Sequence, residues 1–358
     1  MDAWVLGNPG ELIRIKKPIP IPGNAEVLIK IDAVAICATD LEIIEHGFPA
    51  IINGEKPFNK NFTPGHEFMG TIVKLGANVD EYKIGDRVAV EIHAGCGRCS
   101  RCRQGMYTSC HNYGNNYGDI NKGHRANGYT TDGAFTEYAV NHINTLVNVP
   151  KEISDEVATL IVTAGTAMYA IDTLGGLIAG QSLAVTGAGP IGLLCVSVAK
   201  ALGANPIFLS DIIDSRLEIG KSLGADFVLN ANNEDFNSFI LKNNRNIGVD
   251  YLIECSGSLQ ALDQATQLVN RGGKICLAAF SNQPSSVNVG NIVANNISLY
   301  GIRGEGKSAV KRAASLIKQK SLDPSAIHTH TFNMDDLPEA LKYAKDRIDG
   351  AIKVVVRN

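Results

Sequence analysis

The sequence predicts an α/β protein in two parts, a mostly-β part followed by a doubly wound parallel sheet. At 358 residues the chain is long enough for two domains. Up to about Pro150, short apolar runs such as 27–31, 71–75 and 87–91 alternate with Gly, Pro, Asn and Asp, which predicts short strands. From about Lys151, strand-like and helix-like runs alternate, which is typical of a parallel sheet with crossover helices.

The elements of the second part can be placed by their apolar patterns. We expect strands at 183–185, 207–209, 227–229, 250–254, 274–278 and 297–300, with helices at 191–202, 217–223 and 259–269. From about Gly301 the pattern predicts a helix at 309–318 and a strand at 352–356, whose place in the fold it leaves open. Residues 111–133 are rich in Asn, Gly and Tyr and predict a long polar loop.

Composition excludes several classes of protein. The chain is 45% hydrophobic and 19% charged, with a net charge of -3, as in a soluble globular protein. This charge gives no electrostatic basis for binding nucleic acid or anionic membranes. The N-terminus lacks a signal-peptide pattern, and no apolar run approaches the ~20 residues of a membrane span. We therefore expect a cytoplasmic protein that acts on a small molecule, without nucleic-acid or membrane partners.

Four of the eight cysteines lie close together in a pattern typical of a metal site. Cys96, Cys99, Cys102 and Cys110 form C-x2-C-x2-C-x7-C, and Gly95, Gly97 and Gly105 would let this loop wrap around an ion. Four thiolates match tetrahedral zinc and leave no open coordination position, so the site should be structural. Reduced thiols or an iron–sulfur cluster are the alternatives.

A glycine-rich turn predicts a dinucleotide site. The run Gly187-Ala188-Gly189-Pro190-Ile191-Gly192 is G-x-G-x-x-G, and it joins an expected strand to an expected helix. The three glycines would serve a tight turn, close approach of a pyrophosphate and close helix–strand packing, respectively. The helix that begins at Pro190 and Ile191 would present backbone amides to the phosphates.

Asp211 follows the next expected strand, where an acid that binds the ribose diol is expected. Its carboxylate would repel a 2′-phosphate, which favours NAD over NADP. Arg216 could contact a 2′-phosphate, which would favour NADP instead. A glycine turn that binds no nucleotide is the alternative.

Two further residues lie beside apolar runs: Cys37 follows one run, and His66 precedes another. By spacing alone, Cys37 and His66 could be metal ligands or ordinary core residues. Together with the other motifs, however, the chain resembles the zinc-containing medium-chain dehydrogenase/reductase family over essentially its whole length. The matching motifs are Cys37-Ala38-Thr39-Asp40, Gly65-His66-Glu67, the four-cysteine loop, the glycine turn with Asp211, and Glu254-Cys255-Ser256-Gly257. The first motif is more similar to the polyol, threonine and sugar dehydrogenases than to the simple ethanol enzymes.

The resemblance implies a fold and an activity. Residues 1–150 and 301–358 would form a GroES-like, mostly-β catalytic domain with a structural zinc lobe near 92–112, and residues 151–300 a Rossmann domain. The chain would be a zinc-dependent oxidoreductase that transfers hydride between a secondary alcohol of a polyol, sugar or cyclitol and NAD. Relatives assemble as homodimers or homotetramers, and residues 297–300 could supply a pairing edge.

The resemblance also implies a catalytic zinc. Cys37 and His66 match its ligands, and Glu67 matches a neighbour that is a direct ligand in some relatives. The family's further Glu or Cys ligand falls on Val162 or Thr163 here, which is a departure from the pattern. Cys37, His66, Glu67 and a water could still form an open tetrahedral site.

Several other residues receive roles from the same resemblance or from their place in loops. Thr39 and Glu42 would relay the proton that the alcohol releases, and Lys353 would contact the cofactor phosphates. Candidate substrate contacts are His46, Tyr117, His124 and Arg125, although the polar loop could equally be solvated or contact another subunit. Cys195, Cys255 and Cys276 lie in apolar surroundings and are interpreted as core residues.

Two other readings remain open. One is a zinc-free reductase of the same superfamily that acts on activated alkenes or quinones, and the other is a non-catalytic NAD-binding protein. Two zincs per subunit would favour the dehydrogenase, whereas one would favour either alternative.

Overall fold

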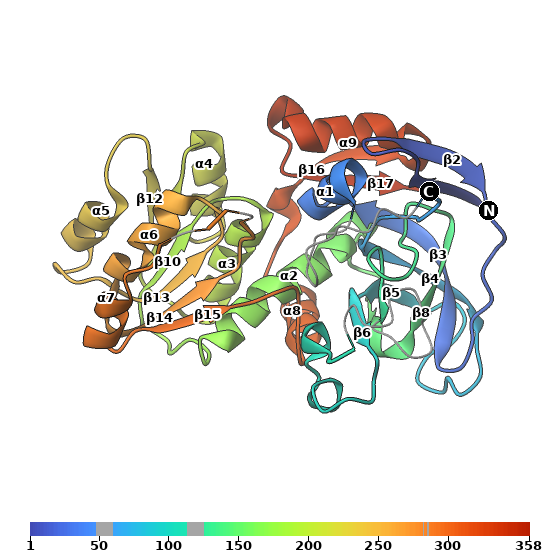
Figure 1. Cartoon of the computed structure of the whole chain (residues 1–358), viewed down its shortest axis with the longest axis horizontal. Helices are drawn as coiled ribbons and strands as arrows, with labels where there is room; N and C mark the ends of the chain where they lie inside the picture. The colour runs from blue at the N-terminus through green and yellow to red at the C-terminus, as the bar shows by residue number, and fades with distance from the viewer. Residues whose placement is uncertain (48–59, 113–124, 282, 285) are drawn as a thin grey trace. The chain divides into compact units, whose positions relative to one another are not determined.

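A computed structural model describes residues 1–47, 60–112, 125–281, 283–284 and 286–358 (Figure 1). The chain divides into two units, each with its own core. The first comprises Met1–Val162, Glu305–Ala314 and His328–Asn358, and the second comprises Thr163–Gly304 and Ser315–Ile327. No helix among the described residues is long and apolar enough to cross a membrane.

The first unit is built mainly from β-strands. Its strands are β1 (Asp2–Leu6), β2 (Leu12–Lys16), β3 (Glu26–Ala35), β4 (Glu67–Leu75), β5 (Arg87–Val90), β6 (His93–Gly95), β7 (Arg125–Ala126), β8 (Tyr138–His142), β9 (Leu146–Asn148), β16 (His328–Asn333) and β17 (Lys353–Arg357). Its helices are α1 (Ala38–His46) and α9 (Leu337–Asp346), while α2 (Asp155–Thr173) and α8 (Ala309–Lys318) each contain residues of both units.

The C-terminal strand, whose place the sequence left open, belongs to the main sheet of this unit. The seven-stranded sheet has the order β16-β17-β3-β4-β5-β9, with β8 paired to β3. Strand β17 runs antiparallel to β3, and Val355 pairs with Ala35. Apolar side chains of β3, β4, β5 and β17 pack into one core that includes Ile29, Phe68, Val88 and Val356. The tail therefore helps to hold the strands that carry the candidate site.

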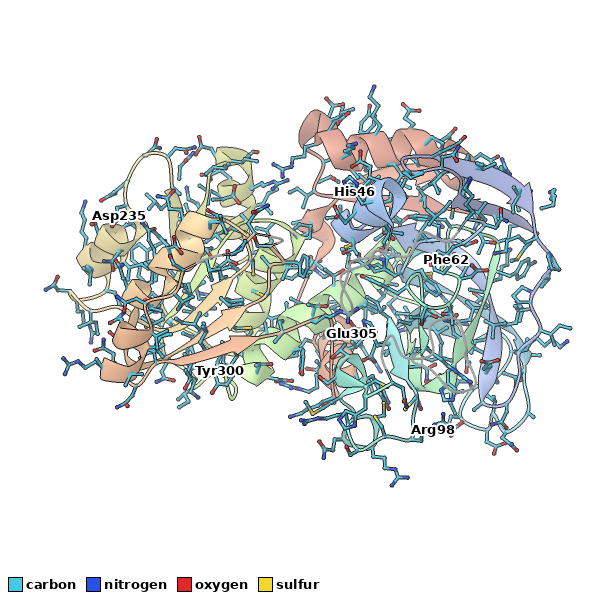
Figure 2. The ribbon with its side chains drawn as sticks, viewed as in Figure 1. His46, Phe62, Arg98, Asp235, Tyr300 and Glu305 are labelled. Atoms are coloured by element: carbon cyan, nitrogen blue, oxygen red, sulfur yellow. The ribbon has the colours of Figure 1, made fainter. Side chains whose placement is uncertain are left out.

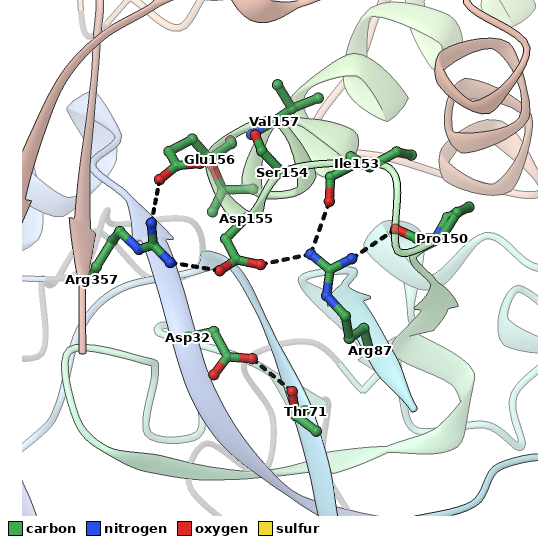
Figure 3. A network of polar contacts seen from close by, with 11 residues as sticks. Asp32, Thr71, Arg87, Pro150, Ile153, Ser154, Asp155, Glu156, Val157 and Arg357 are labelled. Atoms are coloured by element: carbon green, nitrogen blue, oxygen red, sulfur yellow. Dashed lines mark hydrogen bonds and ion pairs between the residues drawn. The ribbon is translucent and has the colours of Figure 1, made fainter. Parts of the chain in front are cut away.

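An arginine–carboxylate network ties β5 and β17 to the start of α2 (Figure 3). Arg87 donates hydrogen bonds to the carbonyls of Pro150 at 2.7 Å and Ile153 at 2.9 Å, and to Asp155 at 2.6 Å. Arg357 binds Asp155 and Glu156, each at 2.9 Å. The two carboxylates also lie in the first turn of α2, where negative charge is stabilised.

Replacing Arg87 by lysine should destabilise the first unit. The planar guanidinium group of Arg87 donates to two carbonyls and a carboxylate at once, and a lysine ammonium cannot reproduce this geometry. We therefore expect a loss of about 1–3 kcal/mol in the free energy of unfolding. Urea denaturation of Arg87→Lys would measure it. The control is Arg14→Lys, because Arg14 pairs with Asp2 and Asp335 at the surface. Equal stability of Arg87→Lys and the wild type would contradict the role given to the network.

The second unit contains the parallel sheet that the sequence predicts. Its strands are β10 (Leu183–Thr186), β11 (Ile207–Asp211), β12 (Phe227–Asn230), β13 (Val249–Glu254), β14 (Val269–Leu277) and β15 (Ser298–Gly301). Its helices are α3 (Pro190–Ala201), α4 (Asp214–Ser222), α5 (Phe236–Asn243), α6 (Leu259–Leu268) and α7 (Val289–Ala294).

The strand order is β12-β11-β10-β13-β14-β15, and every pairing is parallel. Helix α3 contacts α4, and α5 contacts α6, so the helices lie against the sheet in two groups (Figure 1). The chain order reverses between β10 and β13, and in sheets of this kind the crevice at such a point binds ligands. The α/β fold class predicted from the sequence, GroES-like plus Rossmann-type, is confirmed.

The polar loop expected at 111–133 is only partly a loop. Among its described residues, Arg125–Ala126 form β7, which pairs antiparallel with β6. The backbone N–H groups of Tyr129, Thr130 and Thr131 then bond to the carbonyl of Ala126, which forms a tight turn. This turn brings Tyr129 to the candidate site.

Candidate active site

Three metal-ligating side chains meet where β3 and β4 pair. The ligand atoms of Cys37, His66 and Glu67 all lie within 4.8 Å of one another. The register explains this, because Ala35 at the end of β3 pairs with Glu67 at the start of β4. Cys37 and His66 flank these paired residues, so the antiparallel pairing itself assembles the cluster.

Asp40, for which the sequence suggests no role, orients two of these residues. It is fully buried on α1. One carboxylate oxygen accepts the backbone N–H of Cys37 at 2.9 Å, and the other accepts that of Gly65 at 3.1 Å and lies 2.9 Å from Nδ1 of His66. Because Nδ1 is held by Asp40, Nε2 is left to bind a metal. The signal in the sequence was an acid at the third position of the helix that Cys37 caps.

The charge of Asp40 also acts on the imidazole. Burial alone would lower the pKa of His66, but the adjacent carboxylate reverses this effect and raises the pKa well above its usual value. The cluster is therefore an electronegative environment, which suits a cation.

Glu67 shares a buried ion pair with Lys353. The ammonium of Lys353 contacts the Glu67 carboxylate and lies 3.3 Å from the carbonyl oxygen of Ile36. Both side chains are almost fully buried. Burial acts to lower the pKa of Lys353, but the charge of Glu67 outweighs it and raises the pKa. The structure thus places Lys353 on a candidate metal ligand, and its predicted contact with cofactor phosphates stays a prediction.

A hydroxyl and two aromatic rings border the cluster. Oγ1 of Thr39 lies 3.8 Å from Sγ of Cys37. The ring of Tyr129 lies 5.1 Å from that of His66 and 5.9 Å from that of His93. Burial raises the pKa of Tyr129 to about 12, so its phenol keeps its proton and can hydrogen-bond to Thr39. No pattern in the sequence singled out Tyr129 or His93.

The remaining residues predicted for catalysis or substrate binding are dispersed. Glu42 lies on α1, partly buried, and His46 is exposed at the end of the same helix. Arg125 pairs with Glu26 at 3.2 Å. Tyr117 and His124 lie outside the described residues. The roles predicted for these five residues stay predictions.

The four-cysteine loop is a second candidate metal site. The sulfur atoms of Cys96, Cys99, Cys102 and Cys110 lie within 4.8 Å of one another, and those of Cys96 and Cys102 are 4.0 Å apart. Sulfurs at the corners of a tetrahedron around zinc would be ~3.8 Å apart, given ~2.3 Å bonds. All eight cysteines are free thiols. The donor set therefore fits a closed zinc site.

The backbone of this loop follows from its glycines. Gly95 has a φ of +60°, and a Cβ there would lie 2.6 Å from the sulfur of Cys102. Backbone N–H groups stabilise the thiolates. Although burial acts to raise it, donors that include the N–H of Arg98 lower the pKa of Cys96 to about 6.

The glycine turn lies between β10 and α3. Gly187 has a φ of +90°, which disfavours any other residue, and a Cβ on Gly192 would come 1.8 Å from the carbonyl oxygen of Gly187. Gly189 is the N-cap of α3, followed by Pro190 at the first helical position and then Ile191. The turn thus matches the geometry expected for a phosphate-binding helix start.

Asp211 stands at the end of β11, beside this turn. Its carboxylate accepts the backbone N–H of Ala188 at 2.5 Å and that of Ile213 at 2.9 Å. Arg216 lies partly buried on α4. Cys195 and Cys276 are buried and Cys255 is partly buried, as expected of core residues. The acid is therefore fixed at the position where a ribose diol is expected.

Both groups that these sites imply fit the residues present. Cys37, His66 and Glu67 offer sulfur, nitrogen and oxygen donors, and a catalytic zinc uses three such ligands and one open position. The glycine turn leaves open backbone at Gly189, where a Cβ would meet no described atom within 4 Å. Fold and site together point to one class of protein, the zinc-type dehydrogenases.

Comparisons with known proteins agree. Residues 23–151 match the alcohol dehydrogenase GroES-like domain, and residues 190–319 match the zinc-binding dehydrogenase domain. The chain is 35% identical to L-threonine 3-dehydrogenase of Pyrococcus horikoshii, covering 98% of this chain and 96% of that protein. It is 32% identical to sorbitol dehydrogenase of Bacillus subtilis, covering 99% and 97%.

A solved structure extends this likeness to the fold. An alcohol dehydrogenase of Escherichia coli, complexed with NADH, superposes with a TM-score of 0.88 at 26% identity, covering 100% of this chain and 99% of that one. The chain belongs to the zinc-containing medium-chain dehydrogenase/reductase family, and it is an alcohol or polyol dehydrogenase.

Proposed function

We propose that this chain transfers hydride between a secondary alcohol of a polyol, sugar or cyclitol and NAD, with a zinc ion at Cys37, His66 and Glu67. The observation that carries the proposal is the convergence of these three donors, with His66 oriented by Asp40. Residues 1–150 and 301–358 would be the catalytic domain, and residues 151–300 would bind the dinucleotide. The two units of the structure have other bounds, since 151–162 belong to the first unit and 301–304 and 315–327 to the second.

When bound, zinc supplies a Lewis acid that lowers the pKa of an alcohol hydroxyl, and the nicotinamide supplies the hydride acceptor. The chain's own residues have three tasks in this scheme. Asp40 fixes the imidazole of His66, and Lys353 fixes the carboxylate of Glu67. Thr39, beside Cys37, accepts the proton from the substrate and passes it on, with Glu42 as a further member of the path.

The relatives' names support the substrate class, since one is a sorbitol dehydrogenase and another oxidises the alcohol of threonine. Subunits would pair as homodimers or homotetramers. The support is β15, which is the last strand of its sheet and carries the partly exposed Tyr300 (Figure 2). Free thiols in the zinc loop support a reducing, cytoplasmic location.

A substrate screen tests the proposed function directly. Purified protein of known zinc content would be mixed with NAD or NADP and with polyols, sugars, cyclitols, threonine and simple secondary alcohols, while nicotinamide absorbance is followed. A parallel assay would supply NADH or NADPH with quinones or activated alkenes. We expect NAD reduction by one polyol or sugar class and two zincs per chain. One zinc with oxidation of NADH or NADPH by quinones or alkenes would establish the reductase that lacks a catalytic zinc, and one zinc with no turnover would favour the non-catalytic protein.

Asp211→Asn should weaken the preference for NAD. The substitution removes a negative charge where a 2′-phosphate would lie, so we expect the NAD-to-NADP ratio of kcat/KM to fall about 10- to 100-fold. Steady-state kinetics with both cofactors would measure it. Asp214→Asn is the matched control, because Asp214 is exposed in the first turn of α4. An unchanged ratio in Asp211→Asn would refute the role given to this carboxylate.

A further inference from the structure

Glu254 is a buried carboxylate at the end of β13, in the second unit, and it is 2% exposed. Its Oε1 atom accepts the backbone N–H of Ser256 at 2.7 Å and that of Gly257 at 3.0 Å. The same atom also accepts the hydroxyl of Ser256, and that of Thr186 at 3.4 Å. Because hydrogen bonds from N–H and O–H donors stabilise the ionised form of a carboxyl group, these four bonds hold a negatively charged side chain.

Among the residues that the structure describes, no lysine, arginine or histidine forms an ion pair with Glu254. The four hydrogen bonds satisfy its Oε1 atom, but they do not cancel the charge. A buried charge without an opposite charge is costly, and a bound cation reduces that cost. The carboxylate therefore indicates a ligand that carries positive charge.

Glu254 lies at the edge of the parallel sheet where the dinucleotide is expected. Strand β13 pairs with β10 on the side opposite to β11, so the chain order reverses at this place (Figure 1). Thr186, the last residue of β10, pairs with Glu254. The loop after Glu254 also touches the glycine turn, because a Cβ on Gly187 would lie 2.8 Å from Cα of Ser256. The carboxylate thus stands beside the expected pyrophosphate site.

The strand order assigns the two halves of a bound dinucleotide to different strands. Asp211, which would bind the ribose of the adenosine half, lies at the end of β11, and the glycine turn after β10 would hold the pyrophosphate. The nicotinamide half then extends to the other side of β10, toward β13 and Glu254. Asp211 also carries a carboxylate, but on the adenosine side. Glu254 is therefore the carboxylate that faces the nicotinamide half.

The nicotinamide ring is a cation in oxidised NAD and is neutral in NADH, so a negative charge nearby stabilises only the oxidised form. We propose that the carboxylate of Glu254 makes the protein bind NAD in preference to NADH, through the positive charge of the oxidised ring. Glu254 would favour the loading of NAD and the release of NADH, which are the two cofactor steps of alcohol oxidation. This inference rests on the proposed function, and specifically on the dinucleotide site of the second unit.

The test is the ratio of the dissociation constants of NAD and NADH, measured on the full-length protein without an alcohol. NADH would be titrated by its fluorescence, and NAD by its competition with NADH. In Glu254→Gln the ratio of the NAD constant to the NADH constant should rise about 5- to 50-fold, because the amide oxygen can still accept the N–H groups but the charge is lost. Ser256→Ala is the matched control, since it removes one hydrogen bond of the loop and keeps the charge. It should change both constants together and leave their ratio within about twofold.

The outcomes separate this inference from the proposed function. A wild-type ratio in Glu254→Gln would overturn it, and so would an equal rise in Ser256→Ala, because that would assign the effect to the shape of the loop. Glu254→Asp, which keeps the charge, should retain most of the preference for NAD even if Glu254→Gln is unstable, and its failure to do so would also count against the proposal. A wild-type protein that binds neither NAD nor NADH would instead refute the proposed dinucleotide site itself.

Discussion

Cys37→Ser is expected to leave a folded protein that has lost one zinc and about 1,000-fold or more in kcat/KM. The loss follows from removing the only thiolate of the proposed catalytic centre, because Lewis-acid stabilisation contributes several kcal/mol and each ~1.4 kcal/mol is tenfold in rate. Folding should survive because Cys37 is the N-cap of α1, and serine is a favoured N-cap. Metal analysis and steady-state kinetics of one preparation would measure both effects.

Cys276→Ala is the matched control for this experiment. Cys276 is buried on β14 and belongs to neither metal-type cluster, so the variant should keep two zincs and wild-type kinetics. Undiminished turnover in Cys37→Ser would exclude Cys37 as a ligand that the reaction needs. Unfolding of Cys37→Ser, seen in its circular dichroism, would show instead that this cysteine matters to the fold.

Gly192→Ala should be the most damaging single-methyl change in the dinucleotide unit. The new Cβ would lie 1.8 Å from the carbonyl oxygen of Gly187, and neither backbone segment can move without disturbing the turn. We expect a loss of about 3 kcal/mol in the free energy of unfolding, together with weak NADH binding. Thermal unfolding and fluorescence titration with NADH would measure the two effects.

Gly189→Ala separates folding from cofactor binding in the same turn. Gly189 has a φ of -74°, and a Cβ there meets no described atom within 4 Å, so its stability should equal that of the wild type. Its NADH affinity should still fall, because the methyl group would occupy the space that the pyrophosphate needs. Wild-type stability in Gly192→Ala, or wild-type NADH affinity in Gly189→Ala, would contradict these respective roles.

The pattern of the second unit was readable because its central strands are buried on both faces. Strand β10 is Leu-Ala-Val-Thr, β11 begins with Ile-Phe-Leu, and the helix predicted at 309–318 coincides with α8. By contrast, the apolar pattern singled out neither α7 nor α9. Helix α7 is only about one and a half turns long, too short for a sustained helical repeat. Helix α9 does carry such a repeat, at Leu337, Ala340, Leu341 and Ala344, so the sequence held a signal there that the prediction did not use.

In the candidate site, too, the sequence predicted some residues and only the tertiary structure revealed others. Cys37, His66 and the four clustered cysteines lie in short motifs that can be recognised without the fold. The sequence by itself therefore determined the zinc class of the protein, its glycine turn and Asp211. Only the tertiary structure brought Lys353 to Glu67 and Asp40 to His66. The physical reason is sequence separation. Lys353 and Glu67 lie 286 residues apart, and only the pairing of β17 with β3, and of β3 with β4, makes them neighbours.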